Sequence, residues 1–385
     1  MAPKRRKSGG AKIEDVDAAG EEATGAKVAK IEPMMTPQDA VGRVLRGETP
    51  RLALPEGRTF KAISWNVNGL RGLMDKQPEQ LAQLVQQESP DYLCLQEHKL
   101  QEGHIEGMKA RLEELLPGYI SHWSASTVKK GYSGVVVLLK TPPASGGTGG
   151  GKKSAAAQSS IKSFFQPPGA KGAAKGASKG AGDAPGAPAA AGTGLPVVGV
   201  TYDMEGHKGE GRLITVEYDA FFVVGCYVPN SGMKLERLAY RTDEWDVALA
   251  AYLGALAARK PTLLCGDLNV AHQDIDIYNV TAKHVAKSAG TTPQERASFG
   301  RLLEGGWADS FRWAHPAAKG CYTYWSTRAG NRPLNRGLRL DYFVVSEGLV
   351  GSGPGLRLHD AWILDQATVG ASDHCPVGLM LSGLL

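Results

Sequence analysis

Short apolar runs that alternate with helical patterns from Thr59 onward constrain the fold of this chain more than any other feature. Runs of this kind, rich in Val, Ile, Leu and aromatic residues and bounded by Gly or Pro, are typical of buried strands. Their alternation with helical patterns predicts an α/β domain. We expect strands at residues 60–65, 92–95, 135–139, 212–218, 221–227, 262–265, 340–345 and 377–381, and one long helix at 235–258.

The stretch 141–195 interrupts this pattern. It contains 13 Gly, 14 Ala and 6 Pro, so it cannot bury its share of surface and is expected to be disordered. Such an insert is compatible with a folded domain, because its closure costs only roughly 2 kcal/mol more than that of a loop of about eight residues. Strand patterns flank it on both sides, so we expect it to leave a hairpin tip and return there.

Inside this insert, the run 158–165 has the pattern Q-x-x-I-x-x-F-F. It resembles the PIP box, the short peptide by which proteins dock on the DNA sliding clamp. The resemblance implies that Ile161, Phe164 and Phe165 plug a pocket of that clamp, proliferating cell nuclear antigen, while Gln158 hydrogen-bonds to it. The alternative is coincidence in a low-complexity segment. Against it, aromatic pairs are depleted from disordered segments, and these are the only aromatic residues of the insert.

Residues 1–57 are predicted to form a mostly disordered N-terminal extension, with a short helix at 37–46, and residues 58–385 a catalytic domain interrupted by 141–195. The basic run Pro3–Lys7 predicts a nuclear location, although a solvated basic tail is the alternative. The chain carries +5, of which the insert has +5 and residues 1–34 have +1, which leaves −1 for the rest. DNA binding would therefore use a local basic patch.

The five cysteines are scattered and never in C-x-x-C spacing, which favours buried thiols in a reducing compartment. No apolar run approaches the roughly 20 residues that cross a bilayer, and the N-terminus lacks the apolar core of a signal peptide. We therefore expect a protein without membrane contact, and a monomer.

Polar residues recur where the predicted strands end. Each is individually typical of a turn or a solvated side chain, but six such positions at strand ends predict one common site. These positions are Asn66 with Asn68, Glu97, Asn230, Asp267 with Asn269, Asp341, and Asp373 with His374.

These residue types fit the hydrolysis of an anionic phosphodiester, in which a hard divalent cation neutralises charge and stabilises the leaving oxygen. Glu97 is the best single ligand for Mg²⁺, with Asp373 and the carbonyl oxygen of Asn68 as secondary ligands. Neither a zinc-type Cys/His cluster nor a P-loop occurs in the sequence.

The remaining polar residues suit proton transfer. Asp267, held by Asn269, could take a proton from water. His374 could donate hydrogen bonds to the phosphate, with Asp341 fixing its tautomer and raising its basicity.

The motifs W-N-V-N-G-L-R, L-Q-E, G-Y-S-G-V, Y-V-P-N, G-D-L-N-V-A-H, T-P-Q-E-R, A-D-S-F-R, R-L-D-Y and S-D-H-C-P follow one another along the chain. In this order they closely resemble the exonuclease III family of apurinic/apyrimidinic (AP) endonucleases, over about residues 60–140 and 197–385. The resemblance implies a four-layered α/β sandwich of two packed mixed sheets flanked by helices, the endonuclease/exonuclease/phosphatase fold. It also implies Mg²⁺-dependent cleavage 5′ to an abasic site in double-stranded DNA, leaving a 3′-hydroxyl, in nuclear base-excision repair. Mn²⁺ is expected to substitute, and some 3′-exonuclease and 3′-phosphodiesterase activity is expected.

The resemblance also assigns roles to single residues. It places the metal at Glu97, with Asn66, Asn68, Asp267, Asn269, Asp373 and His374 around it. Catalytic roles fall on Tyr227, Asp267, Asn269, Asp341 and His374. DNA contacts fall on Arg71, Lys76, Tyr132, Asn230 and Arg237. A small apolar pocket for the baseless sugar is expected at Phe311, Leu338 and Leu340, for which plain core packing is the alternative.

Two positions depart from the family pattern. Asn68 stands where some members have Asp, which weakens the case for a second tightly bound metal. Leu338 stands where some members have Trp, which predicts a looser pocket and a less strict enzyme.

Two rival functions remain open at this point. A fold-mate with another phosphoester substrate, such as an inositol phosphatase, a sphingomyelinase-like enzyme or a DNase I-like nuclease, would share the carboxylate and histidine pattern. The motifs G-Y-S-G, Y-V-P-N-S-G and R-L-D-Y favour the repair branch instead. A catalytically inactive clamp adaptor is the second rival. Against it stands the joint presence of Glu97, Asp267, Asn269, Asp341, Asp373 and His374.

Overall fold

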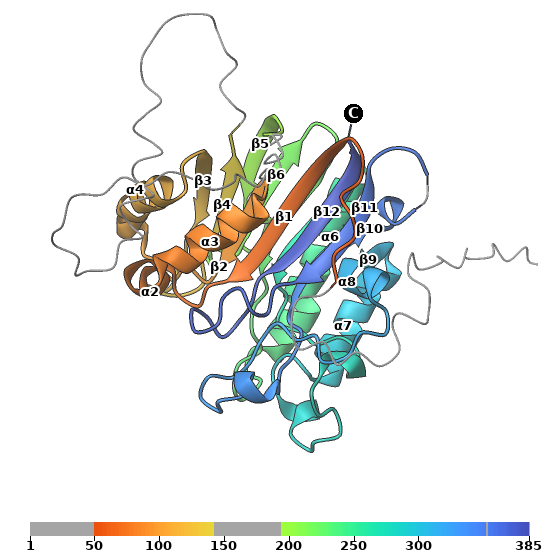
Figure 1. The fold of residues 1–385 in the computed structure, drawn as a ribbon. Coiled ribbons are helices and arrows are strands. Elements are labelled where there is room, and N and C mark those ends of the chain that lie inside the picture. The colour runs from red at the N-terminus through yellow and green to blue at the C-terminus, as the bar shows by residue number, and fades with distance from the viewer. Residues whose placement is uncertain (1–49, 142–193, 352, 385) are drawn as a thin grey trace, which may run out of the picture. The chain divides into compact units, whose positions relative to one another are not determined.

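A computed structural model describes residues 50–141, 194–351 and 353–384 of the protein. Two six-stranded mixed sheets pack face to face there (Figure 1). The strand order of the first sheet is β11 (Arg357–Ile363), β12 (Val377–Leu384), β1 (Arg58–Asn66), β2 (Tyr92–Gln96), β4 (Val135–Lys140) and β3 (Tyr119–Ser124). The order of the second is β5 (Val197–Tyr202), β6 (Leu213–Tyr218), β7 (Phe222–Tyr227), β8 (Thr262–Asp267), β10 (Asp341–Ser346) and β9 (Trp307–Asp309).

Each sheet has one parallel pair at its centre, β1–β2 in the first and β7–β8 in the second, and its other neighbours are antiparallel. The strands of a parallel pair end at the same edge of the sheet. The residues that follow β1 and β2, and those that follow β7 and β8, therefore emerge side by side.

Side chains along the central strands alternate between two cores. Tyr92 and Cys94 of β2 face the core between the sheets, whereas Leu93 and Leu95 face the outer helices. This period of two follows from the pleat of a strand, and it makes strands that are covered on both faces apolar throughout. The outer helices are α2 (Leu70–Lys76), α3 (Pro78–Glu88) and α4 (Ile105–Leu115) on the first sheet and α6 (Asp246–Ala257) and α7 (Pro293–Glu304) on the second.

The predicted four-layered sandwich is confirmed, and the expected strands are present with shifts of one or a few residues at their ends. The strands β3, β5, β9 and β11, which were not predicted, are the four edge strands. β3 and β5 are partly exposed and β9 has only three residues, so none of these three forms a continuous buried apolar run. All five cysteines are buried and free, as expected.

Two expectations about connections are wrong. The strands that flank the insert, β4 and β5, belong to different sheets, so this connection crosses between sheets and does not leave from a hairpin tip. The helix expected at 235–258 includes a π-helical turn, Tyr240–Trp245, before α6, and Leu235 has a left-handed φ of 59°, which is incompatible with a helix there.

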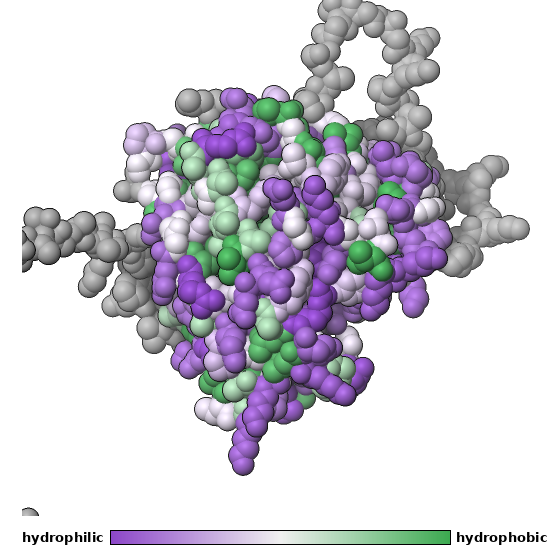
Figure 2. Space-filling model, turned by 180° about the vertical axis from the view of Figure 1, so that it is seen from behind, coloured by the Kyte–Doolittle hydropathy of each residue, from purple (hydrophilic) through white to green (hydrophobic). Residues whose placement is uncertain are grey.

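The N-terminal extension, the helix at 37–46, the basic run and the residues 158–165 lie outside the described residues. The domain boundaries at 57/58 and 141–195 stay predictions. No helix among the described residues is long and apolar enough to span a bilayer. On the face drawn in Figure 2, hydrophilic side chains predominate and apolar ones form small separate patches, as is usual for a protein surface.

Candidate active site

The predicted polar residues meet at the edge where the two parallel pairs end. Asn66 is the last residue of β1 and is fully buried. Its Nδ2 donates to Glu97 Oε1 at 3.0 Å, beside β2, and to Asp267 Oδ2 at 2.9 Å, at the end of β8 in the other sheet. One amide thus ties together two carboxylates delivered by different sheets.

Glu97 directly follows β2 and has a left-handed φ of 55°, an uncommon backbone conformation for this residue type. Its carboxylate accepts hydrogen bonds from Asn66 and from the hydroxyl of Tyr227, and it pairs with Lys99 Nζ at 2.7 Å. Burial opposes the ionisation of Glu97, but the Lys99 ammonium and these hydrogen bonds outweigh it and lower the pKa of Glu97.

Hard oxygen ligands for a cation gather beside Glu97. The Lys99 ammonium contacts both Glu97 Oε2 and Asn68 Oδ1, and Asn68 Nδ2 donates to Asp373 Oδ1 at 2.9 Å. A positive group therefore already lies where two of the predicted ligand oxygens converge. A cleft of about 730 Å³ opens next to them, with Asn68 and Asp373 on its wall. This donor set, carboxylate and amide oxygens with access to water, fits Mg²⁺ or Mn²⁺.

A second group of three possible metal ligands lies next to the first, and Asn66 links the two groups. One side-chain ligand atom from each of Asp267, Asp341 and His374 can be chosen within 4.8 Å of the others, so these residues could hold a divalent metal ion. His374 Nδ1, however, is hydrogen-bonded to Asp341 Oδ2 at 2.8 Å, while His374 Nε2 faces Asp267 Oδ2 at 3.8 Å. The three side chains therefore also form a chain of proton-transfer groups with His374 in the middle.

The protonation states of His374 and Asp267 depend on their burial and on the charges around them. Burial favours neutral His374, but the Asp341 and Asp267 carboxylates prevail and raise the pKa of His374 to about 10. Burial, with Asp341 and Glu97 nearby, raises the pKa of Asp267 to about 7, although His374 opposes this. A cationic imidazole thus stands next to a carboxylate that can accept a proton near neutral pH. Asp341 fixes the imidazole through Nδ1, as predicted.

Two asparagines and one tyrosine complete this edge. The backbone N–H of Asn269 donates to Asp267 Oδ1 at 2.9 Å, so Asn269 holds Asp267 through its backbone. Its side-chain amide donates to the carbonyl of Val228 at 2.9 Å and accepts from Asn230 Nδ2 at 2.8 Å. Burial, then the charges of Glu97 and Asp267, raises the pKa of Tyr227 well above its usual range, so this phenol keeps its proton.

The predicted DNA contacts divide into two sets. Arg71 and Lys76 are exposed on α2, which begins just after Asn68. Tyr132 and Arg237 are instead joined to each other, because Arg237 Nη1 donates to the Tyr132 hydroxyl and its Nη2 pairs with Glu210 at 2.8 Å. Arg237 is therefore not a free surface cation.

Sequence reasoning missed three residues of this region, Lys99, Arg212 and Tyr324. Arg212 is almost fully buried and donates to the Tyr132 hydroxyl at 2.6 Å and to the carbonyl of Tyr227 at 2.9 Å. The signal for it was a single arginine at the start of an apolar strand pattern, where an unpaired charge would be costly.

The expected sugar pocket is only partly assembled as predicted. Leu338 and Leu340 lie in one small apolar cluster with Tyr324, whose ring packs on His374 at 4.9 Å between centroids. Phe311 belongs instead to the core between the two sheets, where it contacts Arg339 and His315. The structure does not place Phe311 with the two leucines, because α8 (Ser310–Ala314) packs it inward against β10 and β11.

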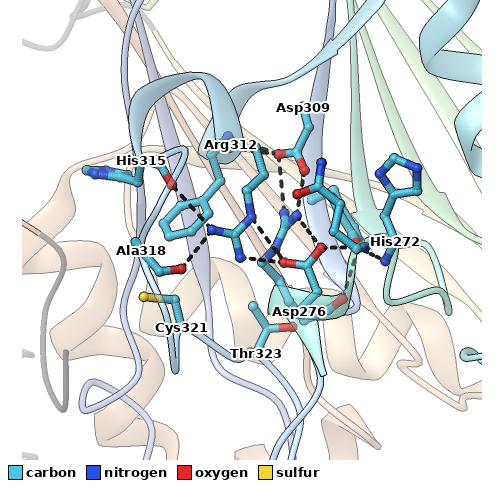
Figure 3. A network of polar contacts seen from close by, with 12 residues as sticks. His272, Asp276, Asp309, Arg312, His315, Ala318, Cys321 and Thr323 are labelled. Carbon is cyan, nitrogen blue, oxygen red and sulfur yellow. Dashed lines mark hydrogen bonds and ion pairs between the residues drawn. The ribbon is translucent and has the colours of Figure 1, made fainter. Parts of the chain in front are cut away.

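A buried network of charges includes Arg339, the residue between the two leucines in the chain (Figure 3 draws this network). Arg339 is fully buried and pairs with Asp276 at 2.8 Å and with Asp309 at 2.6 Å, and Arg312 also binds Asp276 and the carbonyls of His315 and Ala318. Arg339 precedes Leu340 and Asp341 in the chain. The network therefore fixes the chain at Leu340 and at Asp341, which is the first residue of β10 and the partner of His374.

Known proteins with a similar sequence or fold include nucleases and members of one phosphoesterase family. The model of the endonuclease/exonuclease/phosphatase family matches residues 63–374. The chain is 38% identical to an exodeoxyribonuclease of Bacillus subtilis over 84% of this chain and 100% of the relative. It is 38% identical to the DNA repair nuclease APEX1 of Danio rerio over 99% of both chains. It is 36% identical to a DNA-(apurinic or apyrimidinic site) endonuclease of Dictyostelium discoideum, over 85% of this chain and 72% of the relative. Among solved structures, AP endonuclease LMAP of Leishmania major superposes with a TM-score of 0.61 and 28% identity, covering 91% of this chain and 92% of that one.

Proposed function

Because the chain belongs to the endonuclease/exonuclease/phosphatase family, we propose that it hydrolyses the DNA phosphodiester on the 5′ side of an abasic site, leaving a 3′-hydroxyl, in base-excision repair. The observation that carries this proposal is the convergence of Asn66, Glu97, Asp267, Asp341 and His374, from both sheets, on one edge. The names of the relatives, which include AP endonucleases and exodeoxyribonucleases, support DNA as the substrate.

Mg²⁺, or Mn²⁺ in its place, is the proposed cofactor. Glu97, with Asn68 and Asp373 beside it, would hold the ion, because the oxygens of Glu97 and Asn68 already converge on the Lys99 ammonium and Asp373 is hydrogen-bonded to Asn68. When bound, the ion would neutralise the phosphate and stabilise the leaving oxygen. Asn66 would keep the Glu97 carboxylate oriented.

The proton chemistry falls on the chain of buried groups. Asp267 takes a proton from the attacking water at its carboxylate, which its raised pKa near 7 allows, while the backbone N–H of Asn269 orients it. His374, held cationic by Asp341, donates a hydrogen bond from Nε2 to the phosphate. Tyr227 and Asn230 would add neutral hydrogen-bond donors to the phosphate.

Selection of an abasic site is assigned to the apolar cluster of Tyr324, Leu338 and Leu340 beside His374. A sugar without a base fits a small apolar pocket, whereas a normal nucleotide would have to bring its base into it. Leucine at 338 leaves more room than tryptophan would, so we propose a less strict enzyme with additional 3′-exonuclease and 3′-phosphodiesterase activity. Exposed Arg71 and Lys76, together with Tyr132, would contact the DNA backbone.

We further propose a nuclear, monomeric enzyme tethered to the sliding clamp. The basic run Pro3–Lys7 supports nuclear import, and Gln158, Ile161, Phe164 and Phe165 would dock on proliferating cell nuclear antigen. A flexible arm from Pro143 to Gln158 would reach roughly 20 Å. That span suits a clamp that encircles the same DNA.

A labelled duplex with one synthetic abasic site tests the proposal. We expect a single incision 5′ to that site, complete loss with EDTA and recovery with added Mg²⁺. An otherwise identical intact duplex serves as the control. Equal cleavage of the intact duplex would favour a less selective nuclease, and absence of cleavage would favour a clamp adaptor.

A further inference from the structure

Arg241 is a buried cation that binds the backbone of two catalytic loops at once. It is 2% exposed, and its guanidinium donates from Nη1 to the carbonyl of Asn269 at 2.9 Å and from Nη2 to that of Leu268 at 2.7 Å. Nη1 also donates to the carbonyl of Pro229 at 3.2 Å. The first two acceptors lie in the loop after β8, and the third lies in the loop after β7, next to Asn230.

The charge of Arg241 is balanced on its other side. Nε binds Asp246 at 3.3 Å, and Nη1 lies 3.7 Å from the fully buried carboxylate of Glu295. Glu295 in turn accepts a short hydrogen bond from the hydroxyl of Ser231, the residue after Asn230. The Asn230 segment is therefore held from both sides, at Pro229 by Arg241 and at Ser231 by the carboxylate paired with Arg241.

The helix that carries Arg241 is irregular at this point. Tyr240–Trp245 forms a π-helical turn, directly followed by the regular α6. A π turn is rare and is frequently found at functional sites. Here it contains Arg241, whose side chain makes the hydrogen bonds to the two loops.

We infer that Arg241 is a positioning residue, which sets the distance between Asn230 and Asn269 and so aligns both side chains for the phosphate. The bond from Asn230 Nδ2 to Asn269 Oδ1, at 2.8 Å, depends on where Arg241 holds the two backbones. Among the described residues, the Arg241 side chain bonds only to backbone carbonyls and to Asp246 and Glu295, so it does not reach the reacting groups itself. The kinetic test of this role rests on the proposed function, because it measures the cleavage of abasic DNA.

Lysine could not replace it. The guanidinium is a planar fork whose five N–H groups reach several acceptors in fixed directions, whereas an ammonium is a single point with three donors. Arg241→Lys keeps the buried charge and its pairing with Glu295 but cannot span carbonyls of both loops. The substitution therefore separates positioning from charge balance.

The test compares Arg241→Lys with the full-length wild type on the abasic duplex. We expect kcat to fall at least about tenfold while KM changes less than about threefold. In an Asn269→Ala background, Arg241→Lys should cost a smaller factor than in the wild type, because one of the two side chains that it positions is already gone. Leu253→Ala, which opens a cavity in the same outer core, is the control. It should lower Tm, but its kcat, measured at temperatures below the melting range, should equal that of the wild type.

Amide hydrogen exchange provides a readout that needs no substrate. Arg241→Lys should speed exchange in residues 228–231 and 268–270, and Leu253→Ala should leave these segments unchanged. Three outcomes would each overturn the positioning role. They are a wild-type kcat in Arg241→Lys, a full additive loss in the Asn269→Ala background, and unaltered exchange in both loops. A wild type that fails to cut abasic DNA would instead overturn the proposed function, while hydrogen exchange would still decide whether Arg241 holds the loops.

Discussion

Asn66 and Asp267 are joined by a hydrogen bond of 2.9 Å that crosses from one sheet to the other at the catalytic edge. The same Asn66 amide also holds Glu97. The proposed general base and the proposed metal ligand thus share one neutral donor, and relative movement of the sheets would misalign both.

Asn66→Ala removes this shared donor. We expect turnover on an abasic duplex to fall by about 10- to 100-fold, since the buried carboxylate of Asp267 and the partly buried one of Glu97 lose their common partner and can shift. The measurement is steady-state kcat at saturating Mg²⁺, with Tm recorded to confirm folding. Turnover within a factor of two of wild type would show that the bond does not matter for catalysis.

Asp267→Asn keeps the shape of the side chain but cannot accept the proton from water. Turnover should fall at least about a hundredfold, while affinity for the abasic duplex changes little. Single-turnover cleavage and fluorescence anisotropy measure the two quantities on the same DNA. Near-normal turnover would refute Asp267 as the base.

Glu97→Gln neutralises the carboxylate that faces the proposed cation. The Mg²⁺ concentration for half-maximal cleavage should rise at least about tenfold, because the amide oxygen is a weaker ligand for a hard cation. A Mg²⁺ titration after EDTA treatment of both proteins gives the answer. An unchanged half-maximal concentration would mean that the ion is held elsewhere, for example at Asp267, Asp341 and His374.

The buried pair of Asp276 and Arg339 predicts sensitivity to acid. Burial opposes the ionisation of Asp276, but Arg339 and Arg312 prevail and hold the pKa of Asp276 well below its usual range. Its folded pKa lies below its unfolded value, so the pair stabilises the protein above about pH 4, and this contribution is lost as the pH falls further.

Asp276→Asn should therefore cost about 3–5 kcal/mol at neutral pH, because it leaves Arg339 buried with one partner fewer, and it should flatten the acid limb of the stability curve. Urea unfolding between pH 3 and pH 7 would measure both effects. Asp274→Asn, two residues earlier and largely exposed in its pair with Arg296, is the matched control, for which we expect a change within about 0.5 kcal/mol. Equal losses from the two variants would contradict the assignment.

Phe164→Ala combined with Phe165→Ala removes the apolar anchor of the clamp-binding segment. Pull-down by the sliding clamp should be abolished, whereas cleavage of a short duplex, on which no clamp is loaded, should be unchanged. Ser160→Ala, at a free position of the Q-x-x-I-x-x-F-F pattern, should bind like wild type. Clamp binding that survives the double substitution would show that the segment is not the docking site.

The sequence by itself determined the α/β class, the order of the catalytic motifs and the types of residue in the site. These features are local: an apolar run such as Tyr92–Gln96 reports burial on both faces, and Gly266–Asn269 reports a strand end. The places of the polar residues at strand ends also predicted one common site, but the parallel pairing that brings the carboxyl ends of the central strands together was seen only in the structure.

Tertiary structure alone decided which of these residues touch. These contacts join segments that no local periodicity links. Examples are Lys99 with Glu97, Arg212 with Tyr132, and Arg241 with the backbone of the Asn230 and Asn269 loops. Phe311 and Leu340 were both expected in one pocket, yet α8 packs the first into the central core, whereas the second lies in the cluster with Tyr324, whose ring contacts His374. Burial in an interior of low polarity then set the protonation of Asp267 and His374, since a pKa depends on neighbours that only the assembled sheets provide.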